Sequence, residues 1–418
     1  MTAEPAARAW GSLPERLFRT RRIRAQAIIL ALCLWGVCIF DFATPGPFDR
    51  AGNIKFQDFL PVYISARLIA QHRANDLYDS NVQADELRAI IGGPTRVQIP
   101  NVYGPQVGLL FVPLTNFSFL IAAQIWVALS LLLYFACIYL AWSLCPEHRP
   151  WAGLVAIAAL AYPPLFHFFV RGQISVLLLV SFTAAFLALR AGRPWLAGMA
   201  LGVLLIKPQF LVAIPLVLLV GGGWRIFAGL LVSVATQLVL ARLYFAAAVM
   251  QAYFSLLTHP SRWINSVELS LAPIQMHSLR AFWSLLVPSS SVVLALYVVS
   301  SMVVLILASS TWRSSAPLAF RFSALSFAAV LVNPHLFIHD LLVLAPAFLL
   351  LANWILGNEQ SELAPLLKIL LYMAFVLPLL GPLSFWTHLQ LSVVAFAGLV
   401  WVLGGATRQL ASAESRGV

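Results

Sequence analysis

Long runs of apolar residues, each nearly free of charge, recur along this chain from one end to the other. A run of about 20 such residues is long enough to cross the hydrocarbon core of a membrane as a helix. The 418 residues are 61% hydrophobic and only 10% charged, whereas soluble domains carry roughly 25% charged residues. This pattern excludes a soluble enzyme and a disulfide-rich secreted module, and it predicts an all-α polytopic membrane protein.

Polar breaks divide the apolar sequence into about twelve predicted membrane-spanning helices. The predicted spans cover residues 25–42, 122–145, 151–170, 174–189, 195–206, 209–220, 226–250, 287–309, 317–332, 341–356, 365–380 and 388–403. The spans 195–206 and 209–220 are short and meet at Lys207-Pro208. No convincing internal repeat accompanies these spans.

Basic residues indicate which side of the membrane is cytoplasmic. Six arginines precede the first apolar run, and such a cluster holds an N-terminus in the cytoplasm. We therefore predict a basic cytoplasmic N-terminus at 1–24, a single transmembrane domain at 25–405 and a cytoplasmic tail at 406–418. Its outer loops are expected at about 43–106 and about 251–280. The net charge of +11 thus reflects membrane orientation rather than a nucleic-acid partner.

The first predicted outer loop differs in composition from the rest of the chain. Seven of the 15 acidic residues lie in it or at its threshold. Phe59, Tyr63, Ala66 and Ile69 recur at helical spacing and are expected to share one face. The loop is therefore predicted to carry short helices that rest on the membrane surface.

Asp58 is the first candidate for chemistry. It lies in Phe56-Gln57-Asp58-Phe59-Leu60-Pro61-Val62-Tyr63, where aromatic and apolar neighbours surround an acidic side chain. Apolar surroundings favour the neutral acid and suit a general base. The alternative is a helix N-cap or a solvated acid of the loop.

Cations within or beside apolar runs are the second group of candidates. Lys207 stands in Leu204-Leu205-Ile206-Lys207-Pro208, and a charge in a span usually faces a polar cavity or a charged partner. Arg171 and Arg242 have similar settings, and lysine and arginine both suit a phosphate group. The alternatives are a lysine extended to the outer interface for Lys207 and an interfacial anchor for Arg242.

The segment Asn333-Pro334-His335-Leu336-Phe337-Ile338-His339-Asp340 gathers four polar side chains at the outer end of the predicted span 317–332. The i, i+4 spacing of His335 and His339 on a helix would turn both imidazoles one way and suggest a metal ion. Pro334 disfavours a continuous helix, however, and a third ligand would have to come from a distant segment. A substrate-contacting histidine is the preferred interpretation, with interfacial packing as the alternative.

Cofactor signatures are absent from the sequence: it has no Walker loop, no dinucleotide-binding glycine pattern and no CxxC pair. We therefore expect no cofactor and no metal site, although a role for a divalent metal ion stays open.

Several short motifs, taken in order, are similar to those of glycosyltransferase family 87. They are Asp58-Phe59, Tyr63-Ile64-Ser65-Ala66-Arg67, Asp76-Leu77-Tyr78-Asp79, Tyr103-Gly104-Pro105, Val112-Pro113-Leu114, Trp126, Gly172-Gln173, Leu205-Ile206-Lys207-Pro208 and Asn333-Pro334 with His339. The resemblance covers about residues 25–350. This family comprises polyprenyl-phosphate-mannose-dependent mannosyltransferase-like integral membrane proteins of the GT-C superfamily.

The resemblance implies an inverting hexosyltransferase, with mannose as the expected sugar. Its donor would be a polyprenyl-phosphate sugar, its acceptor a lipid or glycan, and its location a bacterial inner membrane with the site on the extracytoplasmic face. Asp58 matches the position of the catalytic acid, while Lys207 and His339 match later motif positions. With Arg171, those two are expected to bind the lipid phosphate. Weaker candidates for the substrate pocket are Gln173, His335, Asp340, Tyr63, Tyr103 and Arg242.

Two other functions compete with this interpretation. A transporter or flippase for a lipid-linked sugar would share the spans and the buried cations, but it is expected to have internal repeats. A non-catalytic scaffold would leave Asp58, Lys207 and His339 without a role. The concentration of acidic residues in one outer loop favours an enzyme with a site on one side of the membrane.

Overall fold

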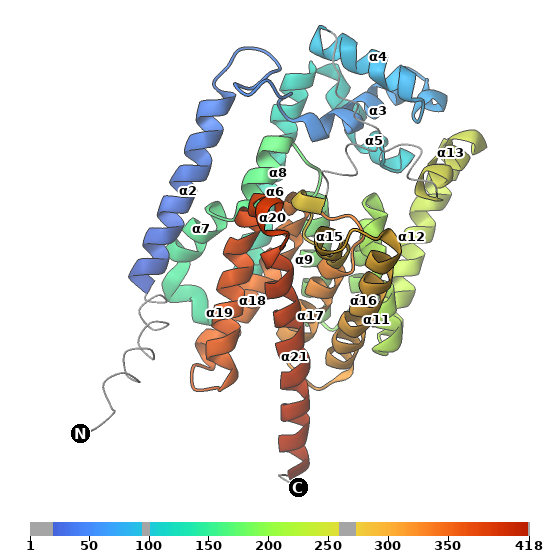
Figure 1. Ribbon diagram of the computed structural model, residues 1–418. Helices are drawn as coiled ribbons and strands as arrows, with labels where there is room; N and C mark the ends of the chain where they lie inside the picture. Colours follow the sequence, from blue (N-terminus) through green and yellow to red (C-terminus); the bar gives the residue numbers. More distant parts are fainter. Residues whose placement is uncertain (1–19, 94–100, 259–272, 417–418) are drawn as a thin grey trace.

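The computed structural model describes residues 20–93, 101–258 and 273–416, and within these ranges the protein is helical (Figure 1). Two isolated β-bridges, Phe48 with Ile54 and Met276 with Phe337, are the only β-type pairings in these ranges. Much of the predicted cytoplasmic N-terminus, with Arg8, Arg16 and Arg19, lies outside the described residues, as does the middle of the second predicted outer loop.

Six helical segments in the described ranges are long and apolar enough to cross a membrane, and one bent pair makes a seventh. They are α2 (Thr20–Phe42), α6 (Phe119–Ser143), α12 (Trp224–Tyr244), α16 (Ser290–Arg313), η8 (Ile338–Leu344) with α18 (Ala345–Gly357), α19 (Leu363–Val376) with η9 (Leu377–Leu383) and α20 (Ser384–Thr387), and the pair η4 (Pro146–Trp151) plus α7 (Ala152–Leu160) with α8 (Pro163–Arg171). The pair bends by 44° next to Pro163 and Pro164, because proline cannot continue the preceding helix. The protein is therefore a multi-pass integral membrane protein.

Shorter apolar helices fill the bundle between these spans. They are α9 (Val176–Arg190), α10 (Pro194–Gly202) with η5 (Val203–Ile206), η6 (Pro208–Leu211) with α11 (Ala213–Val220), α13 (Ala247–Thr258), α15 (Leu279–Leu286) and α17 (Leu318–Leu331). Helix α21 (Leu391–Arg416) is longer, but its apolar part is limited to Leu391–Ala406. The 9 residues of α10 and the 4 of η5 extend about 20 Å, less than the roughly 30 Å of a bilayer core. A complete set of twelve crossings stays a prediction.

The first predicted outer loop forms a helical layer over one end of the bundle, at the top of Figure 1. The predicted loop contains η1 (Gln57–Phe59), α3 (Leu60–Ala70), η2 (Ala74–Asp76) and α4 (Ser80–Ile91). The layer continues with α5 (Pro105–Phe111) and η3 (Val112–Asn116), which lie mostly beyond the predicted end of the loop at about residue 106. The predicted short helices are thus confirmed. Helix α3 nevertheless lies in the interior, because nine of its 11 residues are buried rather than one face alone. The expectation that α3 rests on a surface is wrong.

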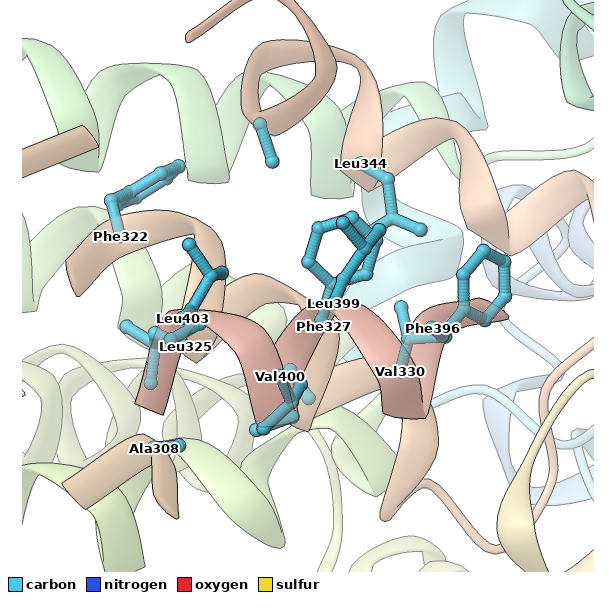
Figure 2. Packing of buried hydrophobic residues seen from close by; sticks show 14 of the residues in the cluster. Ala308, Phe322, Leu325, Phe327, Val330, Leu344, Phe396, Leu399, Val400 and Leu403 are labelled. Carbon is cyan, nitrogen blue, oxygen red and sulfur yellow. The ribbon is translucent and has the colours of Figure 1, made fainter. Parts of the chain in front are cut away.

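The core of the bundle forms where α17 packs between α21, α16 and the segment around Leu344. Figure 2 shows Phe327 of α17 beside Leu399 of α21, and the rings of Phe327 and Phe396 pack with centroids 5.8 Å apart; all three side chains are fully buried. Nearby, α10 crosses α12 at backbone contact. A Cβ atom at Gly198 would lie 1.9 Å from the Ile226 carbonyl oxygen, so only glycine permits this close crossing.

Helix α2 begins and α21 ends at the same end of the bundle, opposite the layer of loop helices (Figure 1). This arrangement agrees with the predicted even number of crossings. Which end faces the cytoplasm stays a prediction that rests on the arginine distribution.

Candidate active site

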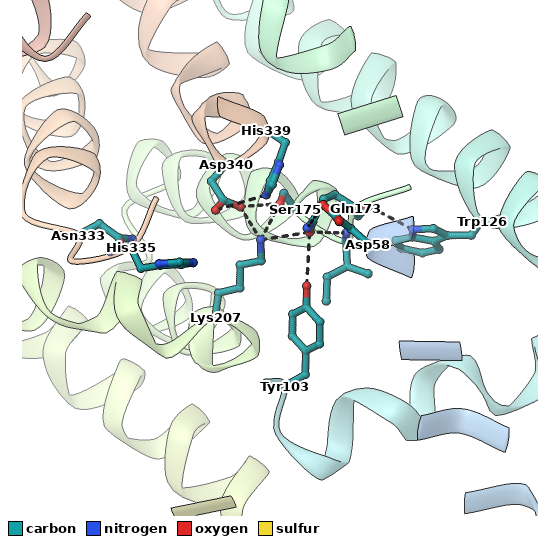
Figure 3. A network of polar contacts seen from close by, with 11 residues as sticks. Asp58, Tyr103, Trp126, Gln173, Ser175, Lys207, Asn333, His335, His339 and Asp340 are labelled. Carbon is teal, nitrogen blue, oxygen red and sulfur yellow. Dashed lines mark hydrogen bonds and ion pairs between the residues drawn. The ribbon is translucent and has the colours of Figure 1, made fainter. Parts of the chain in front are cut away.

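Three breaks between helices meet beneath the layer of loop helices and bring distant polar side chains together (Figure 3). The first break joins α8 to α9 and carries Gln173 and Ser175. The second joins η5 to η6 at Lys207, and the third precedes η8, in which His339 and Asp340 lie. Asp58, in η1, approaches the same network from the loop layer.

A buried ion pair forms the base of this network. Lys207 Nζ lies 2.6 Å from Asp340 Oδ1, and the two side chains are 7% and 2% exposed. Lys207 also donates hydrogen bonds to Ser175 Oγ at 3.1 Å and to Gln173 Oε1 at 3.2 Å. The Ser175 hydroxyl in turn donates to Asp340 Oδ1 at 2.6 Å. Lys207 therefore meets a charged partner in the interior, which excludes a lysine that extends to water at the interface.

An ammonium group has three protons, and Lys207 directs hydrogen bonds to three acceptors. Its charge is neutralised by Asp340, whose buried carboxylate would otherwise lack its cation. The pair thus fixes the positions of the three breaks relative to one another.

Gln173 connects this buried pair to Asp58. Its Nε2 donates a hydrogen bond to Asp58 Oδ2 at 2.8 Å, while its Oε1 faces Lys207 and accepts a long bond of 3.4 Å from the Tyr103 hydroxyl. Asp58 is half-buried and does not cap η1, whose N-cap residue is Phe56. No described residue donates a hydrogen bond to Asp58 Oδ1, so this oxygen is available to a substrate.

Close backbone packing holds Asp58 beside Gln173. Gly172 ends α8 with φ +67, and a Cβ atom there would lie 2.8 Å from the Cβ atom of Phe56. Phe56 itself has a left-handed backbone (φ 55), a strained conformation for a bulky residue that is typical of functional sites. Trp126 Nε1 donates to the Gln173 carbonyl oxygen at 3.1 Å, and its ring stacks on Phe59 with centroids 6.3 Å apart.

His339 is buried beside Asp340, with its Nε2 atom 3.7 Å from Asp340 Oδ2 and without a hydrogen-bond partner among the described residues. A buried imidazole nitrogen without a partner is expected to bind a substrate group. Arg171 is half-buried in the last turn of α8, a helix that packs against η8, in which His339 lies.

His335 does not lie on a helix with His339, because η8 begins only at Ile338. The ring of Phe337 contacts both imidazoles, with centroid distances of 4.8 Å to His335 and 5.6 Å to His339. Burial lowers the pKa of His335, and the effects of Lys207 and Arg280 oppose that of Asp340. Within the described ranges, no three potential metal-ligating side chains lie together.

Within the described ranges, no hydrogen bond joins this network to four of the predicted residues, namely Arg171, His335, Tyr63 and Arg242. The Tyr63 hydroxyl donates to the Phe117 carbonyl oxygen at 2.6 Å and ties α3 to the start of α6. Arg242 is exposed in the last turn of α12. Conversely, Ser175 belongs to the network although sequence reasoning did not select it. The one signal for it is its position two residues after Gln173, at the same break.

The fold and the site define a multi-pass membrane protein with a polar network at one end of its helical bundle. Residues 101–334, more than half of the chain, match glycosyltransferase family 87. The chain therefore belongs to this family and is a membrane glycosyltransferase, with a sugar donor and an acceptor as its substrates. The matched range includes Gln173 and Lys207 but not Asp58, His339 or Asp340. No curated protein and no solved structure matches the chain.

Proposed function

We propose that the protein transfers a hexose, with mannose as the first candidate, from a polyprenyl-phosphate sugar to a hydroxyl group of a lipid or glycan acceptor. The transfer inverts the anomeric carbon and takes place on the extracytoplasmic face. The observation that carries this proposal is Asp58, a half-buried carboxylate that Gln173 holds by Oδ2 while Oδ1 stays available.

In this reaction Asp58 acts as the general base. Its Oδ1 accepts the proton of the acceptor hydroxyl as the hydroxyl oxygen forms a bond to the anomeric carbon. The bond from that carbon to the lipid phosphate breaks on the opposite face, and its electron pair leaves with the phosphate. A single displacement of this kind inverts the configuration, as in enzymes in which one carboxylate activates the attacking oxygen.

Arg171 and His339 are the groups best suited to the departing lipid phosphate. Arg171 is half-buried, and a guanidinium group binds phosphate oxygens through two parallel hydrogen bonds. His339 offers a buried nitrogen that has no hydrogen-bond partner among the described residues. Together they stabilise the charge that develops on the phosphate as the sugar leaves. The reaction as written balances without a cofactor.

The arrangement of the chain supports an extracytoplasmic site. The arginine-rich start of α2 lies at the end of the bundle opposite the loop helices that cover Asp58. Since basic segments favour the cytoplasm, Asp58 is expected on the other side of the membrane. A lipid-linked sugar is the donor suited to that side.

The direct test is sugar transfer by purified protein from a panel of polyprenyl-phosphate sugars, with wild type beside Asp58→Asn. Loss of the base is expected to lower kcat at least about 100-fold while the protein stays folded. Asp85→Asn is the matched control, because Asp85 is an exposed acid of the same layer whose ion pair among the described residues is with Arg88. It should leave transfer unchanged.

Equal rates for wild type and Asp58→Asn would remove Asp58 from the mechanism. If no donor reacts while a lipid-linked sugar crosses proteoliposome membranes, the protein is a transporter or flippase instead.

A further inference from the structure

Lys207 looks like a ligand for the lipid phosphate when the sequence is considered alone, yet its three protons already have acceptors. We propose that Gln173 is the positioning residue of Asp58, and that Lys207 orients the Gln173 amide rather than binding the phosphate. This inference rests on the proposed role of Asp58 as the base.

The orientation of the Gln173 amide follows from the groups around it. Its Oε1 end is approached by Lys207 Nζ at 3.2 Å, the Ile174 backbone N–H at 3.3 Å and the Tyr103 hydroxyl at 3.4 Å. An ammonium group and a peptide N–H can only donate. Burial raises the pKa of Tyr103, so its hydroxyl also stays protonated and can donate. The amide atom facing these donors must be the oxygen.

The amide nitrogen therefore points to Asp58, where Nε2 lies 2.8 Å from Oδ2. The reversed amide would place its N–H groups against the ammonium of Lys207 and its carbonyl oxygen against the carboxylate. Both contacts would be repulsive. Lys207 thus determines which end of Gln173 meets Asp58, although Lys207 and Asp58 share no hydrogen bond.

This contact has a direct consequence for the base. A hydrogen bond from Nε2 stabilises the ionised carboxylate, which is the form that accepts a proton. It also fixes the rotation of the carboxylate, so that Oδ1 is the oxygen left for the acceptor hydroxyl. Gln173 therefore affects the rate of proton transfer without touching the substrate.

Lys207 is poorly placed to leave this arrangement for a phosphate group. Its departure would leave the Asp340 carboxylate, 2% exposed, without its cation, and breaking a buried pair in this way is strongly unfavourable. Binding of the donor phosphate should accordingly depend on Arg171 and be nearly independent of Lys207.

The first experiment compares Gln173→Met and Gln173→Glu with wild type over a range of pH. Removing the amide N–H should lower kcat about 10- to 100-fold and change the KM for the donor by less than about threefold. The acidic limb of the pH–rate profile should move to higher pH in both variants. The larger movement is expected for Gln173→Glu, because two adjacent carboxylates share a proton.

Gln237→Met is the matched control, since Gln237 also donates its amide N–H to a distant group, the Gly202 carbonyl oxygen, besides its local contacts with Ser233. It should leave the position of the acidic limb unchanged. A Gln173→Met profile that falls equally at every pH would overturn the positioning role. If Asp58→Asn is inactive in the same preparation, such a Gln173→Met profile rejects only the positioning role of Gln173. The proposed function is then unaffected.

The second experiment removes the buried pair as a unit with Lys207→Met and Asp340→Leu together. Apolar replacement of both partners preserves folding better than loss of one. Binding of polyprenyl monophosphate should then weaken by less than about threefold, whereas Arg171→Met should weaken it at least about tenfold. If the double variant loses as much affinity for polyprenyl monophosphate as Arg171→Met does, the phosphate is assigned to Lys207 and the proposal is overturned. If the double variant does not fold, the Gln173 variants decide.

Discussion

Lys207 and Lys55 are both more than nine-tenths buried, but their charges are handled differently. Lys207 lies among helix breaks in the interior and pairs with Asp340 at 2.6 Å. Lys55 lies at the edge of a pocket between α2 and α6, where its Nζ donates to the carbonyl oxygens of Thr44 at 2.6 Å and Gly46 at 3.2 Å. Among the described residues, no carboxylate forms an ion pair with Lys55.

The difference shows two ways in which a membrane protein can accommodate a buried cation. Carbonyl oxygens that follow the C-terminal end of a helix carry partial negative charge, so a lysine there ties down the turn. A full carboxylate in the interior neutralises the charge of the lysine, which can then direct its remaining protons to other groups. Only the second arrangement lets a cation control an amide such as that of Gln173.

The largest effect is expected for Lys207→Met, which leaves Asp340 buried without a cation. Loss of one partner of such a pair costs about 3–5 kcal/mol. The measurement is the unfolding free energy of the detergent-solubilised protein, compared with that of the Lys207→Met, Asp340→Leu double variant. The double variant should recover most of the loss. A single variant as stable as wild type would show that Asp340 does not depend on Lys207.

The sequence alone identifies Lys207 and Asp58 as candidates but not their partners. Asp340 lies 133 residues from Lys207, and Gln173 lies 115 residues from Asp58. No local pattern encodes such pairings, because they arise only when separate helix breaks meet. The sequence predicts a phosphate-binding role for Lys207 because a lone buried cation suggests an anionic ligand.

The fold likewise has features that the sequence predicts correctly and one that it does not. Run lengths correctly predict an all-helical membrane protein and the short segments that meet at Lys207, because hydrophobicity and proline are local signals. The surface position expected for α3 is wrong because that expectation rests on one apolar face alone. Leu60 and Ile64 lie outside that face but are apolar as well, and a helix that is apolar on all sides is buried.

A smaller effect is expected for Gly172→Ala. Gly172 lies between the surroundings of Lys55 and those of Lys207. Phe56 lines the pocket of Lys55 and also packs against Gly172, which precedes Gln173. Gly192→Ala is the matched control, because Gly192 has nearly the same φ of +68 but no atom within 4 Å of an added Cβ. Both variants incur backbone strain, while only Gly172→Ala displaces Phe56.

Gly172→Ala should therefore be about 1–3 kcal/mol less stable than Gly192→Ala, since overpacking adds to the strain. It should also lower kcat by moving Asp58 relative to Gln173. Thermal unfolding and transfer assays of the two variants measure both effects. Equal stability and equal kcat would mean that contact between Phe56 and Gly172 does not position the base.

The smallest effect is expected for Lys55→Met. Thr44 is half-buried and Gly46 is exposed, so water can replace the lysine as the hydrogen-bond donor to their carbonyl oxygens. Two hydrogen bonds are lost, but a buried charge is removed as well, and the net cost should be about 1 kcal/mol. Transfer activity should stay close to that of wild type.

Combining Lys55→Met with Lys207→Met tests whether the two lysines are independent. Their effects on the unfolding free energy should add within about 0.5 kcal/mol, because the two share no partner. A Lys55→Met variant that folds but no longer binds polyprenyl monophosphate would contradict this picture. Lys55 would then belong to the donor site, and its two carbonyl partners would be the resting contacts of a cation that releases them for phosphate.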